Sequence, residues 1–85
     1  MLIIRYTKQA KKGLSRIPPK AQRAILSKIV LLAENPQRLE LDIKKMKGEK
    51  GCFRLRVGTY RIIFSEDGVI LDIRDIGPRG SIYRT

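Results

Sequence analysis

The residues best suited to chemistry in this sequence are arginines in its second half. Counting positions across two expected hairpins places three of them side by side on one face of a β-sheet: Arg56, Arg61 and Arg74. Arg54 lies on the same face, two residues before Arg56. Facing like charges destabilise a sheet by a few tenths of a kcal/mol to about 1 kcal/mol per pair, so such a row indicates a ligand of opposite charge. Because a guanidinium group donates paired hydrogen bonds to phosphate and keeps its charge at any working pH, we predict a phosphate-containing ligand.

This row depends on two turns, which we expect to be two-residue loops. Gly58-Thr59 fits a type II′ hairpin turn and Asp67-Gly68 fits a type I′ turn, so Val57 would face Tyr60 and Glu66 would face Val69. The turns separate strands expected at residues 52–57, 60–65 and 69–76. The opposite face of this meander is then apolar and suits a core, with the rows Leu55, Ile62, Ile73 and Phe53, Phe64, Leu71.

The first half of the chain predicts a strand followed by two helices. Residues 2–6 read as a short strand, and Thr7 can cap a helix that ends at Pro18-Pro19. A second amphipathic helix extends to about Glu34, where Asn35-Pro36 stops it. Residues 39–50 are expected to form a basic loop with room for a short strand. We therefore predict one α+β domain over residues 1–85, in which an N-terminal strand and a helical hairpin pack on one face of an antiparallel sheet in the order βααβββ.

Charge narrows the classes of partner. Nineteen Lys and Arg oppose eight Asp and Glu, a net charge of +11, and residues 1–33 contain no acidic side chain. Nucleic acid or an acidic protein would neutralise such a chain. No apolar run approaches the roughly 18–20 residues needed to span a bilayer, so we expect a cytoplasmic protein that does not bind a membrane.

Metal and redox chemistry are not expected. The single Cys52 excludes an internal disulfide, and the absence of His removes both a zinc cluster and the usual general base. Asp72 and Asp75 are expected on opposite faces of one strand, which disfavours a shared cation. We predict no metal and no organic cofactor.

Several motifs together resemble the RelE/ParE superfamily of toxins from type II toxin-antitoxin systems. They are Lys47-Gly48, the stretch RLRVGTYRIIF within residues 53–64, Ile76-Gly77-Pro78-Arg79 and Ile82-Tyr83-Arg84. The resemblance covers essentially the whole chain. In the RelE branch it implies an endonuclease that enters the ribosomal A site and cuts the bound messenger RNA without a metal, through attack of the ribose 2′-hydroxyl on the adjacent phosphorus.

The resemblance also implies roles for individual residues. Arg54 and Arg56 would hold the phosphate, Arg61 would stabilise the transition state, Arg79 would lie near the leaving 5′-oxygen, and Tyr83 would stack on the attacked nucleotide or act as the base. Arg56, Arg61, Arg79 and Tyr83 form the expected catalytic set. The expected RNA contacts are Arg54, Arg74, Lys45, Lys47 and Arg84. Many members carry His where Pro78 stands, and several use a Glu as base; here Glu49 is the only acidic residue close before the strand.

The resemblance implies two partners, which the charge supports: ribosomal RNA at the cationic helices and a cognate antitoxin competing for the same surface. Three alternatives stay open. The chain could be a ParE-like toxin that inhibits DNA gyrase, a non-catalytic RNA-binding module in which the arginines only position phosphates, or an inactive homologue. A solvated basic face with splayed side chains is the alternative for the arginine row itself.

Overall fold

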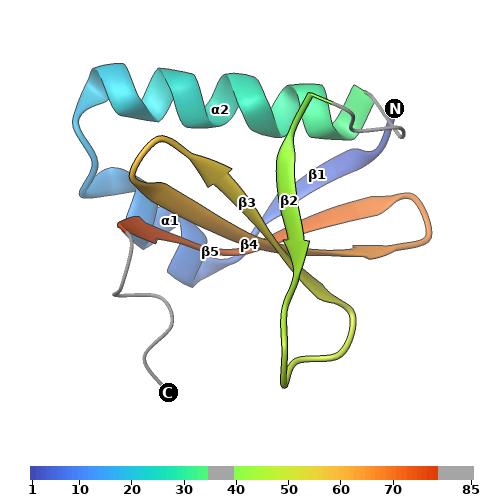
Figure 1. Ribbon diagram of the computed structural model, residues 1–85. Helices are drawn as coiled ribbons and strands as arrows, with labels where there is room; N and C mark the ends of the chain where they lie inside the picture. The colour runs from blue at the N-terminus through green and yellow to red at the C-terminus, as the bar shows by residue number, and fades with distance from the viewer. Residues whose placement is uncertain (35–39, 79–85) are drawn as a thin grey trace.

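A five-stranded sheet with two helices forms the described part of the chain (Figure 1). The structure is a computed structural model, and it describes residues 1–34 and 40–78. Its elements are β1 (Ile3–Tyr6), α1 (Lys8–Ser15), α2 (Pro19–Glu34), β2 (Asp42–Lys45), β3 (Cys52–Val57), β4 (Tyr60–Asp67) and β5 (Ile70–Pro78). This order confirms the predicted α+β fold and adds β2, within the region expected to form a basic loop with room for a short strand.

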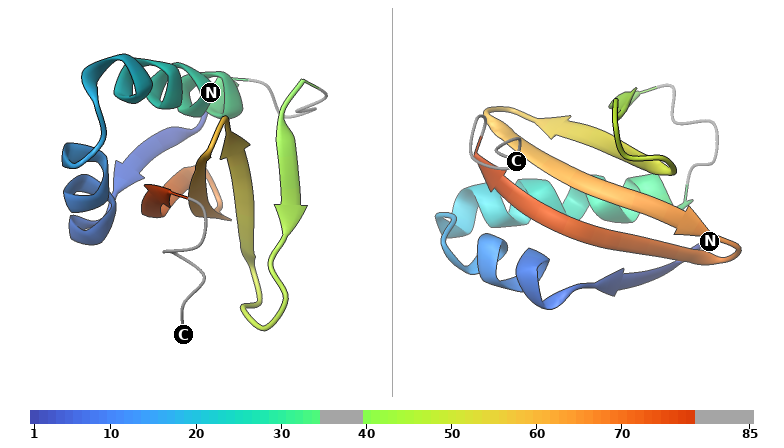
Figure 2. Two further views of the ribbon diagram at one scale, coloured as in Figure 1. Left: turned by 60° about the vertical axis from the view of Figure 1, so that its left-hand side comes forward. Right: turned by 90° about the horizontal axis from the view of Figure 1, so that it is seen from below.

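The strand order in the sheet is β1-β5-β4-β3-β2. The strands β3 to β5 form the predicted antiparallel meander, and β2 extends it. The N-terminal strand was expected to pack on one face of an antiparallel sheet, but β1 joins the sheet and runs parallel to β5, so the sheet is mixed. Figure 2 shows α2 crossing behind the strands and α1 lying beside the end of β5. Packing of the helices on one face leaves the other face of the sheet for a ligand.

The core fills the space between the helices and the inner face of the sheet. Buried side chains come from both layers, and the largest of them are fully buried: Ile25, Ile29, Leu32, Leu55, Ile62, Phe64, Leu71, Ile73 and Ile76. Phe53 stacks on Phe64 with ring centroids 5.6 Å apart. The apolar stripes predicted for the helices and strands therefore meet in one core.

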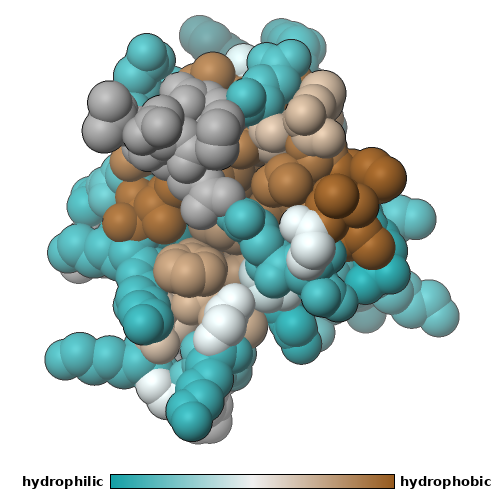
Figure 3. Space-filling view, turned by 90° about the vertical axis from the view of Figure 1, so that its right-hand side faces the viewer, coloured by the Kyte–Doolittle hydropathy of each residue, from teal (hydrophilic) through white to brown (hydrophobic). Residues whose placement is uncertain are grey.

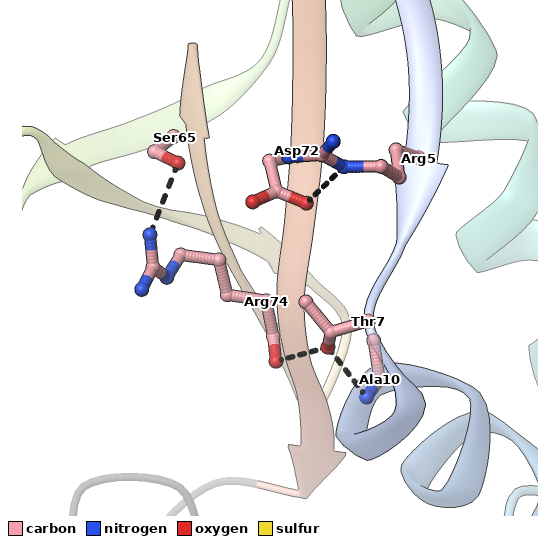
Figure 4. Close-up of polar contacts among 6 residues, drawn as sticks. All are labelled: Arg5, Thr7, Ala10, Ser65, Asp72 and Arg74. Carbon is pink, nitrogen blue, oxygen red and sulfur yellow. Dashed lines mark hydrogen bonds and ion pairs between the residues drawn. The ribbon is translucent and has the colours of Figure 1, made fainter. Parts of the chain in front are cut away.

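The start of α1 follows the sequence prediction closely. Thr7 is the N-cap: its Oγ1 accepts a hydrogen bond from the Ala10 backbone N–H at 3.0 Å. The same hydroxyl donates to the Arg74 carbonyl oxygen at 2.8 Å (Figure 4). Further along α1, Gly13 packs so closely on β5 that a Cβ there would lie 3.1 Å from the Ile76 carbonyl carbon and closer still to its oxygen. A helix can lie this near a strand only where it has no side chain.

The first hairpin has the predicted register, with Val57 opposite Tyr60 and Arg56 opposite Arg61. The predicted register of the second hairpin is wrong. Asp67 faces Ile70, so the loop is Gly68-Val69, and Gly68 takes the first loop position with φ of 61°. A positive φ favours glycine, whereas the predicted loop would have forced Asp67 to a positive φ.

A β-bulge then shifts the pairing of β4 with β5 once more. Phe64 faces Ile73 and Ile63 faces Asp75, so Arg74 has no partner in the ladder and is the extra residue of the bulge. The residue opposite Arg61 is Gly77, not Arg74. The predicted three-arginine row is therefore wrong in its third member, and the core rows are corrected to Leu55, Ile62, Ile76 and Phe53, Phe64, Ile73.

Candidate functional site

Two arginines and a basic hairpin enclose a groove on the outer face of the sheet. We call this the basic groove; it has a volume of about 420 Å³ and is lined by Lys44, Lys45, Met46, Lys47, Arg54 and Arg61. The lysines come from the end of β2 and the following loop, and the arginines come from β3 and β4. Of the predicted site residues, the structure thus brings together Arg54, Arg61, Lys45 and Lys47.

Strand pairing explains how the arginines reach this groove. Arg54 faces Lys44 across the β2–β3 ladder, and Arg61 faces Arg56 across the β3–β4 ladder. These side chains alternate with the core residues Leu55 and Ile62, so they extend from the face opposite the helices. The lysines stand near the arginines because β2 exists as a strand.

Both arginines are largely shielded from solvent. Arg61 is only 7% exposed, and the side chain of Arg54 is 12% exposed. Arg54 Nη2 donates to Asp42 Oδ1 at 3.4 Å, and its Nε is buried with no hydrogen-bond acceptor among the described residues. Burying a charged donor without full compensation costs free energy, so an anion entering the groove would gain more here than at a solvated surface.

Two of the remaining predicted residues lie elsewhere. Arg56 is exposed on the strand pair beside Arg61 and does not line the basic groove. Arg74 extends from the bulge, where its Nη1 lies 3.5 Å from Ser65 Oγ (Figure 4). Because a bulge redirects the side chain that it inserts, Arg74 lines a neighbouring hollow and not the groove that contains Arg61.

That neighbouring hollow, which we call the central hollow, has a volume of about 290 Å³. It is lined by Thr7, Gln9, Met46, Glu49, Ile63, Arg74 and Asp75. Asp75 accepts a hydrogen bond from Gln9 Nε2 at 3.1 Å. Burial raises the pKa of the Asp75 carboxyl, although hydrogen bonds from the Ile76 backbone and from Gln9 act in the opposite direction.

Asp75 is a site residue that sequence reasoning missed, and the bulge explains why. Asp72 pairs with Ser65 and Asp75 pairs with Ile63, two positions on the same face of β4, so both carboxylates lie on the outer face and not on opposite faces as predicted. Asp72 is held by Arg5, with Nε and Oδ1 3.4 Å apart (Figure 4). No group of three potential metal ligands occurs among the described residues.

Burial also controls the single thiol. Cys52 is 5% exposed, and burial is the main cause that raises the pKa of its thiol, with Glu49 acting in the same direction and Arg74 in the opposite one. A thiol that stays protonated is a poor nucleophile, as expected of a packing residue.

Three predicted residues, Arg79, Tyr83 and Arg84, lie outside the described residues. The described part of β5 ends at Pro78, which faces Tyr60, beside the pair Gly77–Arg61. The chain therefore enters its last segment one residue pair from the basic groove.

In the described ranges, no helix is long and apolar enough to cross a bilayer.

Comparison with known proteins relates this chain to toxins of toxin-antitoxin systems. The model of a family described as ParE toxin of the type II toxin-antitoxin system parDE matches residues 4–83. The toxin RelE3 of Methanocaldococcus jannaschii is 34% identical over 84 residues, which cover 92% of this chain and 91% of the relative.

Similar solved structures are also those of toxins, in complexes with their antitoxins. The RelB-RelE antitoxin-toxin complex from Methanococcus jannaschii contains a chain that is 33% identical, with a TM-score of 0.75 and coverage of 98% of this chain and 95% of that chain. The archaeal RelE-RelB complex from Pyrococcus horikoshii OT3 gives 28% identity and a TM-score of 0.77, with 94% and 97% covered.

Proposed function

Since the chain belongs to the RelE/ParE superfamily of toxins of type II toxin-antitoxin systems, we propose that it is an endoribonuclease that cuts messenger RNA in the ribosomal A site. The observation that carries this proposal is the basic groove, where the shielded guanidinium groups of Arg54 and Arg61 meet Lys45 and Lys47. Shielded cations that are already in place are what a developing phosphorane charge requires.

The reaction that fits this groove is an internal transfer at phosphorus. The ribose 2′-oxygen attacks the adjacent phosphorus, the bond to the 5′-oxygen breaks, and the products are a 2′,3′-cyclic phosphate and a 5′-hydroxyl. Little covalent help is needed, and most of the catalysis comes from charge stabilisation and alignment. Arg61 and Arg54 are assigned to the non-bridging oxygens, with Lys45 and Lys47 holding the flanking backbone.

The remaining roles complete the proposal. Arg56 is assigned to the entry of the groove beside Arg61, and Arg74 to an RNA contact in the central hollow. From the last segment of the chain, Arg79 is assigned to the leaving oxygen, Tyr83 to stacking on or deprotonating the attacked nucleotide, and Arg84 to a further backbone contact. A protein that cuts messenger RNA on ribosomes would act in the cytoplasm, which is the localisation that we propose.

A cognate antitoxin is the proposed protein partner, because both solved relatives above are toxin-antitoxin complexes. Two surfaces suit it: the cationic helices, which also suit ribosomal RNA, and an apolar patch formed by Met1, Ile3 and Val69. Ile3 and Val69 are each 62% exposed and adjacent, since the Ile3 N–H donates to the Val69 carbonyl oxygen at 2.7 Å. Figure 3 shows apolar side chains gathered on this side of the molecule. An acidic, amphipathic segment would match both surfaces.

Primer extension on translated messenger RNA tests the nuclease proposal. Wild type should cut within A-site codons, whereas Arg61→Ala and Arg61→Lys should lose cutting by about 100-fold or more, as expected when a positioned donor to a transition state is removed. Arg5→Ala is the matched control, because Arg5 is exposed on β1, at the edge of the sheet opposite β2, and does not line the groove. Circular dichroism checks that each variant is folded. Undiminished cutting by both Arg61 variants would refute the assigned site.

A ParE-like gyrase inhibitor is the second candidate, favoured by the description of the matching family model. Inhibition of gyrase supercoiling by the purified chain, with ribosome-bound messenger RNA left intact, would select it over the nuclease. A module that binds RNA without cutting it would leave both substrates intact while protecting A-site RNA.

A further inference from the structure

The basic groove opens into a longer path across the molecule. Met46 lines both the basic groove and the central hollow. Gln9 and Asp75 line both the central hollow and a third concavity between α1 and the end of β5, with a volume of about 490 Å³. We call this third concavity the α1–β5 hollow. Shared walls make the three spaces neighbours, so one extended ligand could follow all of them from β2 to α1.

The α1–β5 hollow is cationic on one side and aromatic on the other. Lys12 on α1 and Arg16, the C-cap of that helix, lie one turn apart and border the hollow, while Tyr60, at the start of β4, forms part of the opposite wall. Both cations are exposed, and Tyr60 is half-buried. Asp75 is the one carboxylate among its described lining residues, and that carboxylate accepts the Gln9 amide. Exposed cations near an aromatic ring suit a nucleotide, whose phosphate and base need these two partners.

The position of this hollow relative to Arg61 gives it a function. Gly77 lines the hollow and faces Arg61 directly across the β4–β5 ladder. Only this residue pair separates the α1–β5 hollow from the basic groove, and Gly77 has no side chain to block the way. The close approach of Gly13 to Ile76 sets α1 against β5 and so fixes Lys12 and Arg16 near this end of the strand. A strand of RNA that leaves Arg61 would meet these cations next.

We propose that the α1–β5 hollow is a second binding site for the RNA strand, which holds the nucleotides adjacent to the bond positioned at Arg61. Lys12 and Arg16 neutralise phosphate there, and Tyr60 supplies a surface for a base. This proposal rests on RNA being the substrate of the basic groove. Continuity with that groove favours RNA over an acidic protein segment as the occupant.

The test measures binding separately from cleavage. Single-stranded RNAs of increasing length, with 2′-O-methyl groups that prevent cleavage, are titrated against the full chain by fluorescence anisotropy. The variant Lys12→Gln/Arg16→Gln removes the two cations. Arg5→Gln/Lys50→Gln is the matched control, since it removes the same charges from the same two residue types at exposed positions that lie outside both helices and line none of the three spaces.

A length-dependent loss is the expected result. The shortest RNAs, of about three nucleotides, should bind the wild type and both variants alike, because they fill only the basic groove. For RNAs of about seven nucleotides, loss of two phosphate contacts should reduce the salt slope by roughly 1.4 and affinity by about 25-fold at about 0.1 M salt, in the hollow variant alone.

Three results would overturn the proposal. Equal weakening by the two double variants would show that only net charge matters. Equal weakening of short and long RNAs by the hollow variant would place its cations in the basic groove. Loss of antitoxin binding with RNA affinity unchanged would assign the hollow to the protein partner. Because the RNAs cannot be cut, a failed nuclease proposal would show separately, in the Arg61 cleavage assay.

Discussion

Replacing Gly13 by alanine tests how closely α1 lies against the sheet. A methyl group at this position would meet the backbone carbonyl of Ile76, whose carbon would be 3.1 Å away and whose oxygen would be nearer still. The obstacle is main chain near the end of β5, so no rotamer change relieves it. Since carbon atoms prefer separations of about 3.5–4.0 Å, α1 must move away from β5 by an amount on the order of 1 Å.

Two opposing terms determine the size of the effect. Alanine gains about 1 kcal/mol over glycine from helix propensity alone. Overpacking costs typically about 1–3 kcal/mol, and an immovable backbone neighbour belongs at or beyond the upper end of that range. The displaced helix also loosens the packing of two buried residues, Ala10 within α1 and Ile17 just after it. We therefore expect a net loss of about 2 kcal/mol in the free energy of unfolding, or roughly 8–16 °C in Tm for a domain of this size.

Urea and thermal denaturation of the two proteins measure this loss. Gly51→Ala is the matched control: it also adds one methyl group, but into open space, at a residue with φ of 78°. Its expected cost is about 1–2 kcal/mol from backbone strain, with no change in the α1–β5 contact. If Gly13→Ala were as stable as the wild type or more stable, helix propensity would have prevailed, and the close contact on which the α1–β5 hollow depends would be refuted.

Three further predictions follow from single contacts. Thr7→Ala removes both the N-cap and the bond to the Arg74 carbonyl and should lower the free energy of unfolding by about 1–2 kcal/mol in urea titrations, whereas Thr7→Ser should retain most of it. Because burial raises the pKa of Asp75, the folded state binds the proton of this carboxyl more tightly than the unfolded state does. The free energy of unfolding of the wild type should therefore fall, relative to that of Asp75→Asn, as pH rises through about 4 and beyond. A parallel pH dependence of the two proteins would contradict this. Asp42→Asn frees Arg54 from a carboxylate 3.4 Å away and should strengthen the binding of uncleavable RNA by about two- to fivefold, with unchanged or weaker binding as the contrary result.

Local sequence patterns were sufficient for the helices, for the strands other than β2 and for the first hairpin. Thr7 as a cap and the helix break at Pro18-Pro19 both follow from the chemistry of a few neighbouring residues. The Gly58-Thr59 turn fixed Val57 opposite Tyr60, and that pairing places Arg56 beside Arg61. The apolar periodicity likewise identified most of the core, because alternation in strands and spacing in helices are properties of the chain itself.

Local sequence patterns predicted only part of the set of residues that form the candidate site. Arg54, Arg61, Lys45 and Lys47 were chosen from the sequence, yet nothing local required them to share one groove. Their meeting depends on β2, a four-residue strand that gains stability by pairing with β3 and carries no strong signal of its own.

The pairing of the last strand, β5, could not be predicted from the sequence. A shift of one residue at Gly68 and a bulge at Arg74 moved Gly77 opposite Arg61, and brought Asp75 to the same face as Asp72. The bulge lets both Ile73 and Ile76 reach the core while α1 packs on β5, so its position depends on the packing of distant elements. Residue types and their periodicity determined which side chains could bind phosphate. Tertiary packing decided which of them face the same space, because strand register is set by contacts across the whole fold and a shift of one residue reverses the face of every side chain after it.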